Sequence, residues 1–463
     1  MQILIIFCNF AAIFEQKPKK MEKEDLKSKE ELQSNEKNLP VIPVEEPQVN
    51  VLDAFFKIHD FLVAHAFMPI RRLLMDEINW DDRLIAIKGG RGVGKTDFLL
   101  VRAKEIETEW YSMPEPERKK GQRRPRRSHK DIRPCLFVSM NDFYFTENTL
   151  VDLAGQFVKQ GGKYLFLDQL FKYPNWSREL KRCYSKYKDL HIVFCATPVM
   201  PIDEDNNDLK GIVNTYNLRG FSFREYLNLQ TGLRLRSYTL EELLQRHASI
   251  SREICERVHP LDYFKAYLKH GYYPSYLESK SFEAELLKTM NGQLEVDVLM
   301  IKQIDVACLH KLRKLLHILM RETPCALNIS NMSEDIGLSR ATTMNYIKYL
   351  KDSRLINLLY PEDKNFPMKP TKVYMHNTNL ALMDFTRNIP TSDLYETCFY
   401  TFIHGGHKVN ATDRSAMFIV DNKYYFDVKE TASLRDTIRP TAVGEMELGR
   451  GNQMPLWLLG FLY

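Results

Sequence analysis

Residues Gly89–Thr96 read Gly-Gly-Arg-Gly-Val-Gly-Lys-Thr and follow the apolar run Leu84–Ile87 after one lysine. They fill every fixed position of the G-x-x-x-x-G-K-[ST] phosphate-binding loop. Its glycines let successive backbone N–H groups face one anion, Lys95 adds charge for the β- and γ-phosphates, and the Thr96 hydroxyl suits Mg²⁺. A helix predicted over Asp97–Glu105 would direct its positive N-terminus toward the same anion. The alternative is a glycine-rich turn that binds nothing. The predicted phosphate cradle comprises Gly89, Gly90, Arg91, Gly92, Val93, Gly94, Lys95, Thr96 and Asp97.

Length, charge and cysteine usage set the broad class. The 463 residues suit about three or four compact units. A net charge of +5 is modest for this length and says little about partners. The eight cysteines form no C-x-x-C pair, which favours a reducing compartment, and we expect a cytoplasmic protein. No stretch holds eighteen uninterrupted apolar residues, so we expect no membrane span.

The chain begins with a segment that we expect to remain outside the folded part. Residues 1–14 are apolar, yet they lack the basic start and cleavage site of an export signal. Residues 15–50 are rich in Lys, Glu and Pro and hold few large apolar side chains. Such a composition cannot recover the entropy of ordering, so residues 1–50 are predicted to be a flexible tail.

The stretch 51–221 is predicted to be an α/β core around the phosphate-binding loop. Further strands are expected over Cys135–Ser139, Lys163–Asp168 and His191–Ala196. A basic insert over 112–133 separates the first helix from the second strand, and its residues 118–130 hold eight Lys or Arg and no acid. They are interpreted either as a contact for nucleic-acid phosphates or as a solvated loop.

Two polar positions follow predicted strands. Asp168 ends one strand and is the candidate partner of Thr96 in holding Mg²⁺. Gln169 comes next, and its amide cannot take a proton from an attacking water. Thr197 follows another strand, where its hydroxyl would reach the γ-phosphate or cap the chain locally.

Several segments together resemble a known family. They are Gly90–Thr96, then Gly161–Asp168 with Lys172–Leu180, and then Leu218–Leu227. The series resembles the prokaryotic AAA-like ATPases that carry a C-terminal domain of unknown function. This resemblance implies a P-loop NTPase fold, with ATP and Mg²⁺ bound at Gly94, Lys95, Thr96 and Asp168.

The chain departs from that family at catalytic positions. Gln169 stands where relatives usually have Glu, and Ala196-Thr197-Pro198 replaces small hydroxyl residues. Lys210 lies where an arginine is often found, and a lysine lacks the planar guanidinium fork. Such changes impair hydrolysis more than binding.

Downstream of the core, the pattern predicts a helical lid or connector over 222–309 and a winged helix-turn-helix over 310–388. The last helix of this winged helix-turn-helix is predicted to carry outward-facing side chains that could meet a DNA groove; the alternative is a winged helix used for packing or protein contact. These outward-facing residues are Arg340, Thr342, Thr343, Asn345 and Lys348.

The stretch 389–463 resembles a small α+β restriction-endonuclease-like domain. Asp427 and Lys429 match an Asp-x-Lys pair, and Glu396 matches an upstream acid. Met417 stands where a further metal-binding acid is expected, so the domain is interpreted as degenerate. Surface ion pairing explains Asp427 and Lys429 equally well.

The sequence thus favours an ATP-binding AAA-like protein with weak or no hydrolysis, whose nucleotide rearranges the C-terminal domains. Lys95, Asp168 and Gln169 are the candidate catalytic residues. One alternative is an active ATPase completed by a neighbouring subunit in an oligomer. The other is a nucleic-acid-binding module with a vestigial nucleotide site.

Overall fold

A computed structural model describes residues 51–114, 129–202, 207–277, 279–384, 386, 388–412 and 416–463. The tail predicted over 1–50 and residues 118–128 of the basic stretch lie outside the described part.

A parallel sheet forms the centre of the first part of the described chain. Its strands are β1 (Leu84–Lys88), β2 (Cys135–Ser139), β3 (Tyr164–Asp168), β4 (His191–Ala196) and β5 (Asn214–Asn217), in the order β2-β3-β4-β1-β5. All pairings are parallel. The carboxyl ends of the strands therefore meet at one edge, where the chain continues into Gly89, Gln169 and Thr197. The predicted strands are confirmed.

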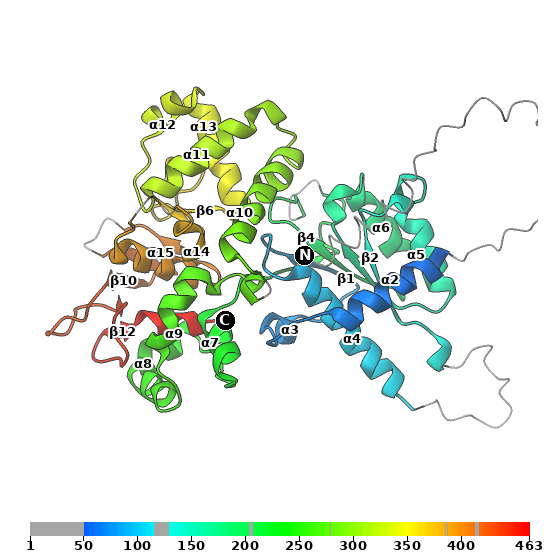
Figure 1. Cartoon of the computed structure of the whole chain (residues 1–463), viewed down its shortest axis with the longest axis horizontal. Coiled ribbons are helices and arrows are strands. Elements are labelled where there is room, and N and C mark those ends of the chain that lie inside the picture. The colour runs from blue at the N-terminus through cyan, green and yellow to red at the C-terminus, as the bar shows by residue number, and fades with distance from the viewer. Residues whose placement is uncertain are drawn as a thin grey trace, which may run out of the picture. The chain divides into compact units, whose positions relative to one another are not determined.

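Helices cover both faces of this sheet because its strands are apolar on both faces (Figure 1). Ile85 and Ile87 share one apolar cluster with Phe98 of α4, whereas Leu84 lies in a second cluster with Phe157 of α5. The helices of this part are α2 (Val51–His65), α3 (Leu74–Glu77), α4 (Lys95–Ser112), α5 (Leu150–Lys159) and α6 (Trp176–Lys186), with 3-10 turns η1 (His129–Asp131), η2 (Phe143–Thr146) and η3 (Leu170–Lys172).

The segment predicted as a lid or connector is helical, and its two halves pack in different places. It comprises α7 (Phe223–Thr231), α8 (Leu240–Cys255), α9 (Pro260–Ala266), η4 (Tyr267–Gly271), η5 (Pro274–Leu277), α10 (Phe282–Gly292), the π-helix η6 (Gln293–Met300) and η7 (Val306–Cys308). Phe223 of α7 packs against Trp457 and Phe461 near the chain end. Met290 of α10 and Val298 of η6 instead join the apolar cluster of α4.

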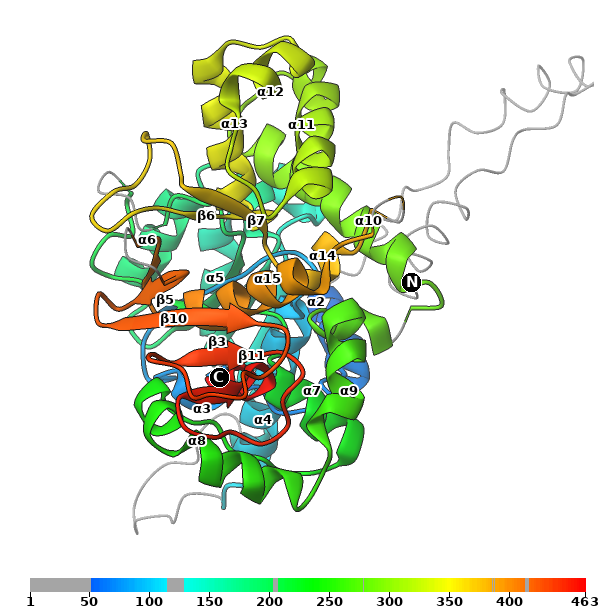
Figure 2. The same cartoon turned by 90° about the vertical axis from the view of Figure 1, so that its left-hand side faces the viewer.

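Three helices and a two-stranded antiparallel sheet follow (Figures 1 and 2). They are α11 (Leu309–Glu322), α12 (Ile329–Ile336), α13 (Arg340–Asp352), β6 (Ile356–Leu359) and β7 (Lys372–Met375). These elements lie where the sequence places them, and their winged-helix interpretation stays a prediction.

One residue of α13 contradicts the expected outward face. Thr343 is fully buried, and its hydroxyl donates to the Ser339 carbonyl oxygen at 3.0 Å. It lies four and seven residues before the buried Ile347 and Leu350, which places all three on one face of a helix. Arg340 and Asn345 are exposed, and Thr342 and Lys348 are half-buried.

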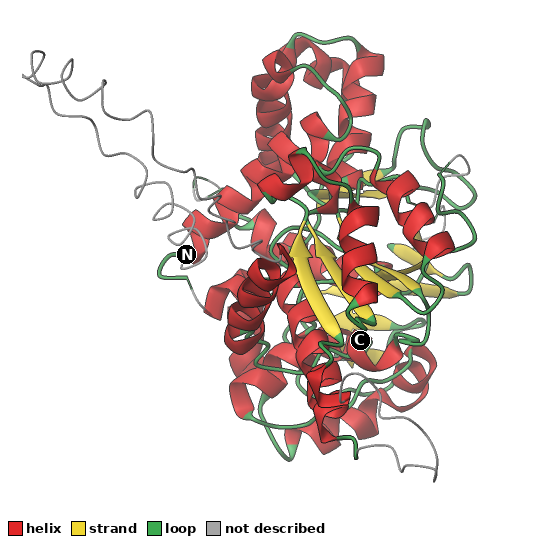
Figure 3. Cartoon of the chain, turned by 90° about the vertical axis from the view of Figure 1, so that its right-hand side faces the viewer, coloured by secondary structure: helices red, strands yellow, loops and turns green. Residues whose placement is uncertain are grey.

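The last part holds a mixed sheet in the order β12-β11-β10-β9-β8. Strands β8 to β10 pair antiparallel, and β10 to β12 pair parallel (Figure 2). Figure 3 shows the strands of the whole chain lying among helices. The elements are α14 (Thr378–Ala381), α15 (Thr391–His404), β8 (Val409–Asn410), β9 (Phe418–Val420), β10 (Tyr424–Lys429), β11 (Thr441–Val443), β12 (Gln453–Pro455) and η8 (Leu456–Phe461).

The acids proposed for a nuclease-like site are engaged in separate contacts. Glu396 is buried and accepts from Lys372 Nζ at 2.7 Å and Tyr374 Oη at 2.5 Å. Asp427 pairs with Arg439, and Lys429 donates to a serine hydroxyl. Across the described ranges, no group of three or more His, Cys, Asp or Glu is placed to hold a metal ion. The structure therefore favours the ion-pairing interpretation of Asp427.

None of the helices in the described ranges has both the length and the apolar character needed to cross a membrane.

Candidate functional site

The loop Gly89–Thr96 bends sharply between β1 and α4. Gly92 and Gly94 have φ angles of 78° and 87°, a left-handed conformation that strains residues with a Cβ atom. Gly94 is the N-cap residue of α4. At Gly89, a Cβ atom would lie 2.5 Å from the Leu218 carbonyl oxygen, so the neighbouring backbone also requires glycine there. The predicted strand-loop-helix context is confirmed.

Lys95, the first residue of α4, folds back over the loop. Its Nζ donates to the carbonyl oxygens of Gly89 at 2.8 Å and Gly90 at 2.7 Å. Burial lowers the pKa of the Lys95 ammonium, while the nearby Asp297 and Asp168 act in the opposite direction. A half-buried ammonium whose hydrogen bonds go to neutral carbonyl oxygens is well suited to exchange them for phosphate oxygens.

Thr96 and Asp168 lie side by side, although 72 residues separate them. The Thr96 hydroxyl donates to Asp168 Oδ2 at 2.8 Å, and Asp168 Oδ1 accepts from the Gln169 backbone N–H at 2.8 Å. A hydroxyl and one carboxylate beside a phosphate cradle form the usual sparse protein contribution to a Mg²⁺ site. The donor set thus fits Mg²⁺, and its metal-binding role stays a prediction.

Two residues at strand ends have unusual local states. Gln169 adopts a left-handed backbone with φ 53°, directly after β3. Thr197 is 4% exposed, and its Oγ1 finds no hydrogen-bond partner within the part of the chain that the structure describes. A buried hydroxyl without a partner is costly, so Thr197 is available to a ligand at this edge.

A cavity of about 580 Å³ lies beside the loop. This volume is in the range of ordinary small-molecule sites. Of the predicted residues, the lining includes Arg91, Gly92, Gly94, Lys95, Thr96, Asp97, Asp168 and Gln169. Gly89, Gly90 and Val93 belong to the loop but not to the lining.

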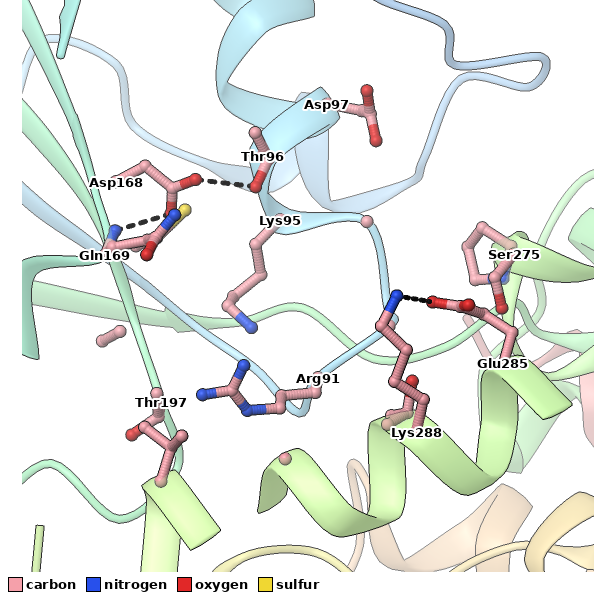
Figure 4. Close-up of a pocket in the computed structure, with 18 of the residues that line it drawn as sticks. Arg91, Lys95, Thr96, Asp97, Asp168, Gln169, Thr197, Ser275, Glu285 and Lys288 are labelled. Carbon is pink, nitrogen blue, oxygen red and sulfur yellow. Dashed lines mark hydrogen bonds and ion pairs between the residues drawn. The ribbon is translucent and has the colours of Figure 1, made fainter. Parts of the chain in front are cut away.

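The opposite wall of the cavity comes from residues that sequence reasoning missed. Figure 4 shows Arg91 and Lys95 pointing into the same space, with Glu285 and Lys288 of α10 across from the loop. Nothing in the local pattern of α10 distinguishes it from any amphipathic helix. Its contribution, with η6, is Glu285, Lys288, Thr289, Gly292 and Val296.

An ion pair links the loop to η6. Arg91 Nη2 lies 3.2 Å from Asp297 Oδ1, and the Arg91 guanidinium lies over the Phe171 ring at 5.6 Å. Asp297 is fully buried, and its Oδ2 has no hydrogen-bond partner among the described residues. Burial raises the pKa of Asp297, against the effect of Arg91 and Lys95. The ion pair holds the loop to a helix more than 200 residues away in sequence. Only one of the two Asp297 carboxylate oxygens has a partner among the described residues.

Comparisons with known proteins extend this picture. Residues 261–384 match a domain of unknown function (DUF8612). No match was found among curated proteins. Among solved structures, the chain is similar to a point variant of RuvB from Thermotoga maritima, with 14% identity, a TM-score of 0.26, and 73% of this chain and 95% of that chain covered.

Two other solved structures show similarly distant likeness. The Aeropyrum pernix ORC1 protein in complex with DNA has 9% identity and a TM-score of 0.28, covering 74% of this chain and 95% of that one. PCH-2 of C. elegans has 14% identity and a TM-score of 0.22, covering 65% and 69%.

The family model of an AAA domain matches residues 81–227. This range contains all five strands of the parallel sheet, the loop Gly89–Thr96 and Asp168. Residues 81–227 are therefore similar to AAA domains, and their parallel sheet and loop have the arrangement of a P-loop NTPase fold.

Proposed function

We propose that the protein binds ATP with Mg²⁺ in the cavity beside Gly89–Thr96 and uses this binding, with little or no hydrolysis, to rearrange its C-terminal parts. One observation carries the proposal. A single cavity is lined by the phosphate-binding loop on one side and by α10 and η6 on the other. A nucleotide in this cavity would contact both the phosphate-binding loop and the helices α10 and η6.

The residues take distinct roles in binding. The loop N–H groups and the start of α4 hold the phosphates, and Lys95 neutralises their charge. Thr96 and Asp168 would hold Mg²⁺, which supplies charge compensation between the phosphates when bound. The unpaired Thr197 hydroxyl lines the same cavity and would donate to a terminal phosphate oxygen or to its water.

Weak hydrolysis follows from the chemistry at position 169. The amide of Gln169 can orient a water but cannot accept its proton. The stretch 207–212, just before β5, contains Lys210 and no arginine. Loss of such groups lowers turnover by orders of magnitude while leaving the phosphate cradle intact.

Coupling to the C-terminal parts is proposed to run through Arg91. A polyphosphate in the cavity competes with Asp297 for the Arg91 guanidinium, because both are anionic. Once Arg91 turns to the phosphates, Asp297 is left buried without its charge partner. That state is costly, so η6 shifts relative to the loop.

The proposal extends to the cellular location, the oligomeric state and a DNA partner. We place the protein in the cytoplasm and allow for an oligomer. DNA is a candidate partner through Arg340, Thr342, Asn345 and Lys348, of which Lys348 Nζ lies 4.8 Å from the Phe366 ring centre. The basic stretch 118–130 is the other candidate contact.

The experiment measures nucleotide affinity and phosphate release side by side for the wild type, Lys95→Ala and Gln169→Glu. Lys104→Ala serves as control, because Lys104 is an exposed lysine on the same helix, α4. We expect Lys95→Ala to abolish binding, Lys104→Ala to change nothing, and Gln169→Glu to raise turnover.

The alternatives predict different results. Brisk wild-type turnover that rises with protein concentration would favour an ATPase completed by a neighbouring subunit. Salt-dependent DNA binding without any affinity for nucleotide would favour a nucleic-acid module with a vestigial site. Either result would overturn the proposed function.

A further inference from the structure

Four basic side chains from distant parts of the sequence lie near one another, and none of them lines the nucleotide cavity. Arg219 follows β5, Arg354 follows α13, His376 follows β7, and His404 ends α15. We call this group the basic recess. Arg219, Arg354 and His376 are half-buried, and His404 is exposed.

Contacts tie the recess together from four elements. The Arg219 guanidinium rests against the backbone of Gly405, where a Cβ atom would collide with it, and lies 4.5 Å from the Tyr463 ring centre. Arg354 Nη2 donates to Asn217 Oδ1 at 2.7 Å. His376 Nε2 lies 3.4 Å from the Tyr272 hydroxyl. Gly405 directly follows His404, and Arg219, Arg354 and His404 all lie near enough to His376 to act on its pKa, so the four side chains are neighbours.

The backbone at one of these positions is strained. Arg354 has φ 62°, a left-handed conformation that is uncommon for a residue with a long side chain. A strained position of this kind persists where the surroundings or a function require it.

The recess lacks compensating negative charge. Within the described ranges, neither Arg219 nor Arg354 forms an ion pair with an acid; Arg354 donates to the neutral Asn217, and Arg219 lies over the Tyr463 ring. His404 is exposed as a whole residue, but the protein around its imidazole and the charges of Lys351, Arg219 and Arg354 together lower its pKa to about 4. Burial likewise lowers the pKa of His376 well below its ordinary value, assisted by Arg354, His404 and Arg219.

An unpartnered hydroxyl belongs to the ring that packs against Arg219. The Tyr463 side chain lies against Arg219, and its buried Oη has no hydrogen-bond partner among the residues that the structure describes. A native protein rarely leaves a buried hydroxyl unpaired beside an uncompensated guanidinium. A ligand with several acceptor oxygens would satisfy both.

We propose that the basic recess is a second anion site, which binds a phosphate group through Arg219 and Arg354, with His376, His404 and Tyr463 completing its rim. Two guanidinium groups present forked donors, and these match the geometry of phosphate oxygens. The phosphate belongs either to a free phosphorylated compound or to the backbone of a nucleic acid. Both offer the same chemistry to the arginines.

The test uses the full chain carrying Lys95→Ala, so that the nucleotide cavity does not contribute to anion binding. Pyrophosphate is titrated by calorimetry into this protein and into versions that also carry Arg354→Gln or Arg219→Gln. Arg252→Gln is the matched control, because Arg252 is an exposed arginine on α8. In parallel, a fluorescein-labelled single-stranded oligonucleotide is titrated at several salt concentrations.

We expect each recess variant to weaken phosphate binding by about tenfold or more, which is the usual effect of losing a charge-assisted hydrogen bond. Arg252→Gln leaves binding unchanged. If the source is a free compound, pyrophosphate binding shows this loss and oligonucleotide binding does not. If the source is a nucleic-acid backbone, oligonucleotide affinity falls and its salt dependence decreases by roughly one ion per arginine removed.

Arg219→Gln also removes a packing contact, so each variant is first checked by thermal unfolding. Arg354→Gln and His404→Gln keep the test decisive if Arg219→Gln unfolds, because Arg354 has one side-chain partner and His404 is exposed. The proposal is overturned if neither probe binds, or if both bind the folded variants as tightly as the parent. This outcome does not depend on whether ATP binds at Gly89–Thr96.

Discussion

Replacing Asp297 with Asn tests whether η6 restrains the phosphate-binding loop. The carboxylate is fully buried, pairs with Arg91 at 3.2 Å, and is near enough to Lys95 to act on its pKa. Asp297→Asn keeps the shape of the side chain but removes its negative charge. We expect ATP to bind more tightly, because Arg91 is released and an anion next to the phosphate site is lost.

The size of the effect follows from Coulomb's law. At an effective dielectric constant of about 20, a unit charge roughly 10 Å from one phosphate charge contributes about 1.7 kcal/mol. Because Mg²⁺ neutralises part of the polyphosphate charge, we count the repulsion between the Asp297 carboxylate and a single phosphate charge. Because 1.4 kcal/mol corresponds to a factor of ten, we expect affinity to rise by about tenfold.

The assay is titration of a fluorescent ATP analogue with Mg²⁺ present, at low and moderate salt. Glu295→Gln is the matched control. It removes the same charge from the same helix, but Glu295 pairs with Arg313 at the surface. A double-mutant cycle of Arg91→Gln and Asp297→Asn isolates the contribution of the pair itself.

Unchanged or weaker nucleotide binding in a folded Asp297→Asn protein would refute the restraint. Equal tightening in Glu295→Gln would instead assign the effect to general surface charge. A coupling energy near zero in the cycle would show that Arg91 and Asp297 act independently on the nucleotide.

Three further results are expected. Asp168→Asn should reduce the Mg²⁺ dependence of ATP affinity, because it removes the carboxylate that accepts from the Thr96 hydroxyl; titrations with and without Mg²⁺ check this, and full retention of the dependence would exclude Asp168 as a ligand. Leu315→Ala should lower the free energy of unfolding by about 2–5 kcal/mol in urea, since Leu315 is fully buried in the cluster shared by α11 and α4; a loss below this range would mean that the site collapses. The thermal midpoint should fall as the pH decreases from the ordinary histidine pKa of about 6.5 toward the lowered pKa of His376. The reason is that burial, together with Arg354, Arg219 and His404, makes the charged His376 ring unfavourable in the folded state. The thermal midpoint of His376→Gln should fall less over the same pH range, and an identical pH profile would contradict this cause.

The sequence by itself determined the phosphate-binding loop and the strands around it. Apolar runs of five or six residues specify buried parallel strands, and a glycine-rich motif after such a run specifies a bend into a helix. These signals are local, so β1, β3, β4 and the start of α4 lie where the pattern predicts. The side chains at the carboxyl ends then come together because parallel strands share one edge.

The expected outward position of Thr343 failed for a local reason that the pattern contained. Thr343, Ile347 and Leu350 follow helical spacing, and a threonine methyl packs inside once its hydroxyl bonds to the preceding turn. The helical spacing of Thr343 therefore determines its position more than its polar hydroxyl does. The contacts of Glu396 could not be predicted for a different reason, because its partners Lys372 and Tyr374 lie on a strand whose packing against α15 no local pattern reveals.

Only the tertiary structure decided which distant elements meet at the loop and at the basic recess. Arg91 reaches Asp297 across 206 residues, and Arg354 reaches Asn217 across 137. Periodicity tells which face of a helix is buried, but not which surface buries it. The identity of a long-range partner depends on how whole elements pack, and this information is spread over every residue of the core.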